Sequence, residues 1–335
     1  MKPDDTLRQL EQVDPAPREL VEGAARRPAA RAVLDRILEA PAPAPSQRAP
    51  RRAPLGIAAG IVAILVAVSV AIVQRPQQVE LPEVRVVLTR AAEAAAGAAE
   101  PQLAPGQYLY TRVEAVERFT ATTDHQWTAL LPVQREFWIA PDGSGRVREV
   151  PGTPTFPGAR DRARWRADGK PRIQGTTSDR VVAPGSLVPD LGSEVSNDAD
   201  RLAAGLLKTE IATELPESQR LFVAASDLLS KPLVDPTLRS SLFRLIAGLD
   251  GVELLGRVED PNGRMGIAVG IRSRATGVLS RRVMIFDEAT SVVLADKAVL
   301  LGEAEWIDAT PPITVGSHVF GTTAVVSSDH ARPGE

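Results

Sequence analysis

The sequence predicts an α+β fold: a single transmembrane helix followed by an extracytoplasmic antiparallel sheet packed with helices. Three observations lead to this prediction. Residues 55–73 form a charge-free apolar run, stretches after Gly106 alternate apolar and polar residues between turn sequences, and residues 197–248 carry apolar residues at helical spacing. Hairpins combined with a separate block of helices are typical of α+β domains.

The apolar run, LGIAAGIVAILVAVSVAIV, is long enough to cross a membrane. As a helix it would reach roughly 28 Å, close to the ~30 Å hydrocarbon core of a bilayer. A core helix of a soluble domain rarely runs so far without a charged group, and a cleaved signal peptide would lie at the extreme N-terminus. We therefore expect a transmembrane helix over residues 54–74.

Basic residues set the expected orientation of this helix. Arg48, Arg51 and Arg52 crowd its N-terminal side, whereas only Arg75 lies close on the other side. The positive-inside rule then places residues 1–53 in the cytoplasm and the rest outside, in a single-pass protein of the plasma membrane.

Small side chains form a stripe along the apolar run. The members that would lie on one helix face are Gly56, Gly60, Ala63 and Ala67. Such stripes let two transmembrane helices approach closely, which favours a homodimer. The alternative is that Ala and Gly are simply common in this chain.

The leader, residues 1–53, has two stretches with helical spacing, 4–13 and 17–39, and a Pro-rich spacer at 41–54. It has too little apolar surface for a core of its own. One interpretation is a pair of marginal helices or a disordered segment. The other is a pair of amphipathic helices that bind a cytoplasmic protein partner.

Composition excludes several kinds of chemistry. The chain has 335 residues, a net charge of −3, no Cys and three His. Without Cys there are no disulfides, no thiol catalysis and no cysteine-based metal centres, and the His residues have no metal-binding spacing. No phosphate-binding or nucleophile motif occurs, and the overall charge does not suit nucleic acid. We expect no cofactor, no nucleic-acid partner and a non-enzymatic role.

After a stalk at 75–81, the outer domain is expected over 82–328, with a tail at 329–335. A helix is predicted over 82–99, because its apolar residues share one face. Alternation and hairpin turns predict strands in these segments: 107–119, 131–140, 146–150, 252–260, 264–273, 280–287, 292–301 and 313–327. Three further helices are expected at 197–208, 214–230 and 235–248, with Asp235 as the cap of the last.

Residues 159–169, ARDRARWRADG, lie in a region that is hard to assign, and we consider this segment as a strand. Four arginines then point to one side: Arg160, Arg162, Arg164 and Arg166. One interpretation is an anion-binding strand for a polymer or a lipid headgroup. The other is a solvated edge strand whose like charges discourage pairing with another chain.

Aromatic residues suggest a ligand site in the sheet. Trp138 alternates with Phe137 and Ile139, so it lies on the opposite face. A curved sheet with aromatic residues on its concave face would hold an acyl chain or another hydrophobic ligand. Packing in a core is the alternative role for these side chains.

Several stretches together resemble an uncharacterised actinobacterial family of single-pass membrane proteins. They are LPEVRVVLTRAAEAA, PGQYLYTRVEAVER, REFWIAPDGSGRVRE and KPLVDPTLRSSLFRLIAGLDGVELLGRVEDPNGRMGIAV, within residues 79–300. Members of that family are often encoded beside extracytoplasmic-function sigma factors, so the resemblance implies an anti-sigma-like role with a sigma factor bound by residues 1–53. The zinc-binding His and Cys pattern of common anti-sigma domains is absent from this segment. The helix-then-hairpins order is also loosely similar to LolA/RseB-type half-barrels.

Two functions are expected from these features. The first is an envelope sensor or regulator that signals through the leader. The second is an anchored binding or carrier module for a hydrophobic envelope ligand such as a lipid, without signalling.

Overall fold

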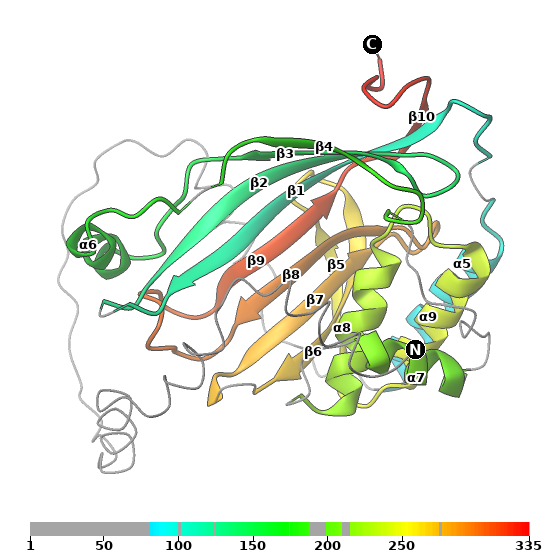
Figure 1. Ribbon diagram of the computed structural model, residues 1–335. Coiled ribbons are helices and arrows are strands. Elements are labelled where there is room, and N and C mark those ends of the chain that lie inside the picture. The colour runs from blue at the N-terminus through cyan, green and yellow to red at the C-terminus, as the bar shows by residue number, and fades with distance from the viewer. Residues whose placement is uncertain are drawn as a thin grey trace, which may run out of the picture. The chain divides into compact units, whose positions relative to one another are not determined.

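The computed structural model describes residues 81–99, 102–123, 125–173, 175–187, 199–209, 215–274 and 277–334. This part of the chain is an α+β domain with a large antiparallel sheet and five helices (Figure 1). The α+β class and the antiparallel sheet packed with helices are thereby confirmed.

The leader, the predicted transmembrane helix at 54–74 and its stripe Gly56, Gly60, Ala63 and Ala67 lie outside the described residues. Among the residues that are described, no helix has both the length and the apolar character needed to span a bilayer. The transmembrane helix, its orientation and the homodimer stay predictions.

The strands form one sheet in the order β4-β3-β2-β1-β9-β8-β7-β6-β5, with β10 paired to β1. Their bounds are β1 Tyr108–Ala121, β2 Trp127–Ile139, β3 Gly145–Pro151, β4 Ser178–Val182, β5 Val252–Glu259, β6 Met265–Ser273, β7 Ser280–Phe286, β8 Val293–Leu300, β9 Ile313–Phe320 and β10 Ala324–Val326. The strands predicted from alternation and hairpin turns, within residues 107–150 and 252–327, are present, and β1 pairs with three partners. Consecutive strands are joined mostly as hairpins, as the turn sequences predicted.

Helices α5 (Leu81–Ala96), α7 (Ala199–Thr209), α8 (Glu217–Leu229) and α9 (Pro236–Gly248) occur where helical spacing predicted them. Asp235 caps α9 by accepting hydrogen bonds from the backbone N–H groups of Thr237 and Leu238, at 2.8 and 2.9 Å.

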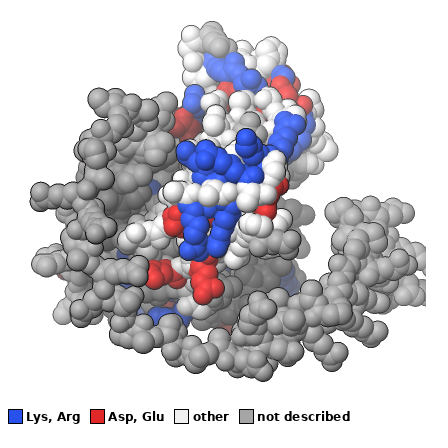
Figure 2. Space-filling view, turned by 90° about the vertical axis from the view of Figure 1, so that its left-hand side faces the viewer, with Lys and Arg blue, Asp and Glu red and all other residues white. Residues whose placement is uncertain are grey.

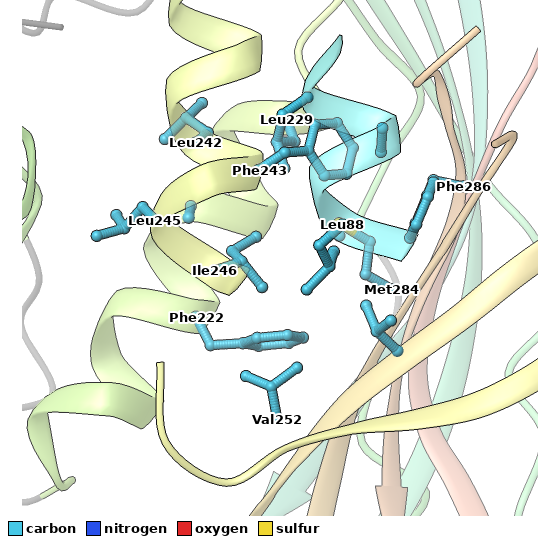
Figure 3. Packing of buried hydrophobic residues seen from close by; sticks show 14 of the residues in the cluster. Leu88, Phe222, Leu229, Leu242, Phe243, Leu245, Ile246, Val252, Met284 and Phe286 are labelled. Carbon is cyan, nitrogen blue, oxygen red and sulfur yellow. The ribbon is translucent and has the colours of Figure 1, made fainter. Parts of the chain in front are cut away.

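These helices bury their apolar faces against the β5–β8 part of the sheet and form the largest core. Figure 3 shows Leu88 of α5 between the side chains of α9 and those of the sheet. Phe243 of α9 packs against Phe286 of β7, with ring centroids 5.1 Å apart and planes tilted by 60°.

Helix α5 presents small side chains to this core. Ala91, Ala92 and Ala95 are fully buried, as is Leu88. Because alanine has no side chain beyond Cβ, it allows neighbouring helices to approach closely. The alanine-rich sequence of α5 therefore serves its close packing against α9.

The segment with alternating arginines is a helix, α6 (Ala159–Ala167), so the predicted strand is wrong. The reason lies in Asp161, which is 2% exposed. Its carboxylate accepts hydrogen bonds from the backbone N–H of Thr128, at 2.9 Å, and from that of Asp308, at 2.8 Å. These contacts with distant segments hold one turn of helix against the end of the sheet.

Ala331 and Arg332, within the predicted tail at 329–335, are tied to the sheet face opposite the helices. Trp138 is 1% exposed there, packs beside Tyr110 and donates a hydrogen bond of 2.6 Å to the carbonyl oxygen of Ala331. Arg332 donates to both carboxylate oxygens of Glu136, at 2.7 and 3.1 Å. The last residues of the domain thus cover part of the sheet.

Candidate ligand-binding cavity

A cavity of about 770 Å³ opens between the sheet and the α8–α9 end of the helical layer. Its volume lies within the range of ordinary small-molecule sites, roughly 300–1,000 Å³. It is lined by segments that are far apart in the sequence, from residues 98–99 after α5 to residue 323 before β10.

Alternate residues of neighbouring strands form one wall. They are Thr111 and Val113 of β1, Arg135, Phe137 and Ile139 of β2, and His318 and Phe320 of β9. Thr111 lies directly opposite Phe137 in the sheet, and Val113 lies opposite Arg135. Because side chains alternate between the two faces of a strand, these pairs point into the cavity together.

The opposite wall comes from the end of α8, the following loop and the start of α9. Leu229, Leu233 and Val234 make this wall apolar, while Lys231 and Arg239 bring positive charge to it. Pro232 ends α8, and Asp235 starts α9 three residues later. The short loop thereby holds both helix ends against the cavity.

Most charged side chains in the cavity have a partner. Asp227 lies 3.6 Å from Arg282, and both carboxylate oxygens of Asp296 lie 3.1 Å from Nδ1 of His318. Arg135 pairs with Glu117. Each of the two acidic side chains that line the cavity, Asp227 and Asp296, thus lies beside a basic side chain.

Arg239 is different. Its Nε atom is buried and has no hydrogen-bond partner among the described residues, and no ion pair of its guanidinium is present there. Burial lowers its pKa from the ordinary value. A partly buried charge without a counter-charge is unfavourable, so an anion placed beside it would be bound favourably.

The cavity therefore combines apolar walls with an excess of positive charge. This chemistry suits a molecule with an apolar body and an acidic head, such as an acyl carboxylate or phosphate. Within the described ranges, no group of three His, Asp or Glu side chains is placed to hold a metal ion.

The aromatic residues of β2 are divided between the two faces, as predicted. Phe137 and Ile139 line the cavity, whereas Trp138 lies on the other face under the C-terminal residues. Of the remaining tryptophans, Trp127 and Trp165 pack in a small core beneath α6.

The predicted arginine group is elsewhere. None of Arg160, Arg162, Arg164 and Arg166 lines this cavity, and α6 divides them between different sides of a helix. Arg160 and Arg164, one turn apart, line a separate recess beside His125.

The charged residues of the cavity were not predicted from the sequence, although a signal was present. Arg239 lies three, four and seven residues before Leu242, Phe243 and Ile246, which are fully buried. A charged residue on the apolar face of a helix indicates a polar site inside the domain.

No protein-family description, no curated protein and no solved structure matches this chain. The resemblance to an actinobacterial membrane-protein family and to half-barrel carriers stays a prediction.

Proposed function

We propose that this chain is a single-pass, membrane-anchored, non-enzymatic sensor or regulator of the cell envelope, whose outer domain binds an amphipathic anion in the cavity. The observation that carries the proposal is the cavity itself, with apolar walls and the unpaired Arg239 among the described residues. The leader, residues 1–53, would bind a cytoplasmic protein, and a sigma factor is the partner that the family resemblance suggests.

The position of the cavity supports signalling. Ala98 and Ala99, which line it, directly follow α5, and α5 follows the stalk in the sequence. A ligand in the cavity would contact residues just after the C-terminal end of α5, the first helix after the predicted stalk. A ligand that binds one arrangement of α5 more tightly than another would shift the equilibrium between them, and this difference in binding free energy would drive the signal.

Ligand binding is tested with the full chain in nanodiscs of zwitterionic lipid, using a fluorescent fatty acid as the probe. We expect Arg239→Gln to weaken binding roughly tenfold, the value of one charge-assisted hydrogen bond. Arg244→Gln is the matched control, because Arg244 is exposed on the same helix. Equal affinity of the two variants, or no uptake by the wild type, would contradict the proposal.

An anchored carrier without signalling is the second candidate, and the same cavity favours it. The two functions differ in the leader. Capture of a cytoplasmic protein by the full chain, changed by the fatty acid and lost when residues 1–53 are deleted, supports the sensor. Fatty-acid binding with no such capture supports the carrier.

A further inference from the structure

Helix α6 carries a second candidate site, at the other end of β2 from the turn to β3. The segment 160–172 contains six Lys or Arg and two Asp. Figure 2 shows basic side chains gathered on the side of the domain that bears α6. Most of these side chains, including Arg160, Arg162 and Arg166, are exposed.

The two acids of this segment do not neutralise the arginines. The carboxylate of Asp161 is occupied by the two backbone N–H groups described above. Asp168 accepts hydrogen bonds from Thr123 and from the indole N–H of Trp127, at 2.5 and 2.7 Å, and these bonds lower its pKa. None of the four α6 arginines forms an ion pair within the described part of the chain.

Arg160 and Arg164 line a recess of about 520 Å³ with His125, Gln126 and Glu305. Each arginine is oriented by one hydrogen bond to a backbone carbonyl: Arg160 to that of Glu305, at 3.4 Å, and Arg164 to that of Gln126, at 2.8 Å. A guanidinium has five N–H donors, so each retains donors and its full charge.

The recess is held by the fold and does not depend on α6 alone. The backbone N–H of Arg160 donates to the carboxylate of Asp308, at 2.8 Å. Beneath the helix, Phe156 packs against Trp165, with ring centroids 5.1 Å apart. The backbone that carries the two arginines is therefore positioned before any ligand arrives, which reduces the entropy lost on binding.

We propose that this recess binds a phosphate group of a linear phosphate polymer, with Arg160 and Arg164 as its two donors and His125 beside them. Planar guanidinium groups match the oxygens of phosphate in paired hydrogen bonds. Arg162 and Arg166, on the other side of α6, extend the positive charge beyond the recess, so neighbouring phosphates of one polymer are also attracted.

A polymer fits better than a lipid surface. Membrane-surface helices present large apolar side chains beside their basic ones. Here the outward side chains of α6 are arginines and alanines, while Trp127 and Trp165 belong to the small core beneath it. A recess between a hairpin tip and a helix also admits a flexible chain more readily than a flat bilayer.

The test measures binding of fluorescently labelled linear polyphosphate to the full chain in nanodiscs of zwitterionic lipid. We expect Arg160→Gln/Arg164→Gln to weaken binding at least roughly tenfold. The control, Arg85→Gln/Arg244→Gln, removes the same charge from exposed positions of α5 and α9 and should change the affinity less than about twofold. Arg160→Lys/Arg164→Lys, which keeps the charge but loses the planar fork, should fall between them.

Three outcomes would overturn the proposal. Equal loss in the control would show that only net charge matters. Inorganic phosphate that binds as tightly as the polymer would show a single-ion site. Binding to vesicles with phosphatidylglycerol, lost in the Gln variant while polyphosphate binding is absent, would assign the recess to lipid headgroups.

Discussion

The carboxylate of Glu136 lies almost fully buried on the sheet face opposite the cavity. It accepts hydrogen bonds from Arg332, from the hydroxyl of Tyr110, at 2.9 Å, and from Arg148, at 3.0 Å. The bond with Arg332 is the main cause that lowers the pKa of Glu136 from 4.5 to about 2. This side chain connects β1, β2, β3 and the C-terminal residues.

Glu136→Gln tests this network. Because the folded-state pKa is below the unfolded one, the carboxylate stabilises the fold fully above pH 4.5, and this contribution is lost as the pH falls toward 2. At 1.36 kcal/mol per pKa unit, the contribution is at most about 3 kcal/mol. We expect urea unfolding to show a variant about 2–3 kcal/mol less stable than the wild type at pH 7, with roughly half of that difference at pH 3.

The control for this prediction is Glu149→Gln. Glu149 forms only long ion pairs, 3.6 Å to Arg135 and 3.7 Å to Arg180, and its side chain is partly exposed. Its replacement should change stability by less than about 1 kcal/mol. If both variants lose equal stability, the special role of Glu136 is wrong.

Tyr110 reports on the same cluster. Burial, and next the hydrogen bond to Glu136, raise the pKa of Tyr110 to about 12. The chain has two tyrosines, so Tyr108→Phe leaves Tyr110 as the only one. We expect the tyrosinate absorbance of this variant to rise near pH 12 and not near pH 10, because the neutral phenol is the favoured form in the folded protein.

By the same linkage, the neutral Tyr110 stabilises the fold below pH 10, and this contribution is lost as the pH rises toward 12. Adding Glu136→Gln to Tyr108→Phe should lower the midpoint of the absorbance rise. A midpoint near pH 10 while the near-ultraviolet circular dichroism still shows a folded protein would contradict the buried position of Tyr110.

At the scale of the element, two glycines separate the effect of helix propensity on stability from the effect of packing against a neighbouring segment. Gly205 lies within α7, and nothing surrounds the position of an added Cβ within 4 Å. Gly158 precedes α6, and a Cβ there would overlap the backbone and side chain of Asp308. The first glycine weakens its helix, whereas the second allows its helix to sit on a neighbouring segment.

We expect Gly205→Ala to raise the free energy of unfolding by roughly 0.5–1 kcal/mol, the difference in helix propensity. Gly158→Ala should lower it by roughly 2 kcal/mol or more, because Asp308 must move and its hydrogen bond to Arg160 is lost. Urea unfolding followed by circular dichroism measures both. Stabilisation by Gly158→Ala would show that α6 does not depend on Asp308.

At the scale of the whole molecule, β1 joins the two parts of the sheet. It pairs with β2 along its full length on one side and with β9 and β10 on the other. Ala115, in its middle, is 3% exposed and lies opposite Val133 and His318. In the described sheet, β2, β3 and β4 are connected through β1 to the strands that carry the helices.

Ala115→Pro should therefore prevent the domain from folding, because proline removes a ladder hydrogen bond and clashes inside a central strand. Val181→Pro is the matched change in β4, an edge strand in which Val181 is 77% exposed. That variant should stay folded and lose at most roughly 3 kcal/mol. Soluble yield and urea unfolding measure the difference, and a folded, stable Ala115→Pro protein would contradict the central role of β1.

Sequence periodicity predicted the secondary structure correctly in segments that have a single strong period. Residues 252–301 alternate, carry turn sequences such as Asn262-Gly263, and form four strands in the predicted hairpins. Helical spacing with an Asp235 cap likewise predicted α9. In these segments local preference and tertiary packing favour the same structure, so the sequence is sufficient.

The prediction from alternation was wrong at residues 159–167. A segment with arginine at every second position can form either a strand or a helix. The helix forms because Asp161 and Gly158 contact segments near Thr128 and Asp308, which are distant in the chain. Contacts of this kind leave no periodic signal in the sequence.

The sequence by itself determined the α+β class, the positions of the hairpins and helices, and the division of Phe137 and Trp138 between two faces of a strand. Only the tertiary structure decided that α6 is a helix, that the last residues cover Trp138, and that Arg239 lines a cavity with Phe137. The physical reason is the sequence separation of the contacts. Periodicity depends on neighbouring residues and shows which side of an element is buried, whereas a site is formed by side chains that are distant in the sequence.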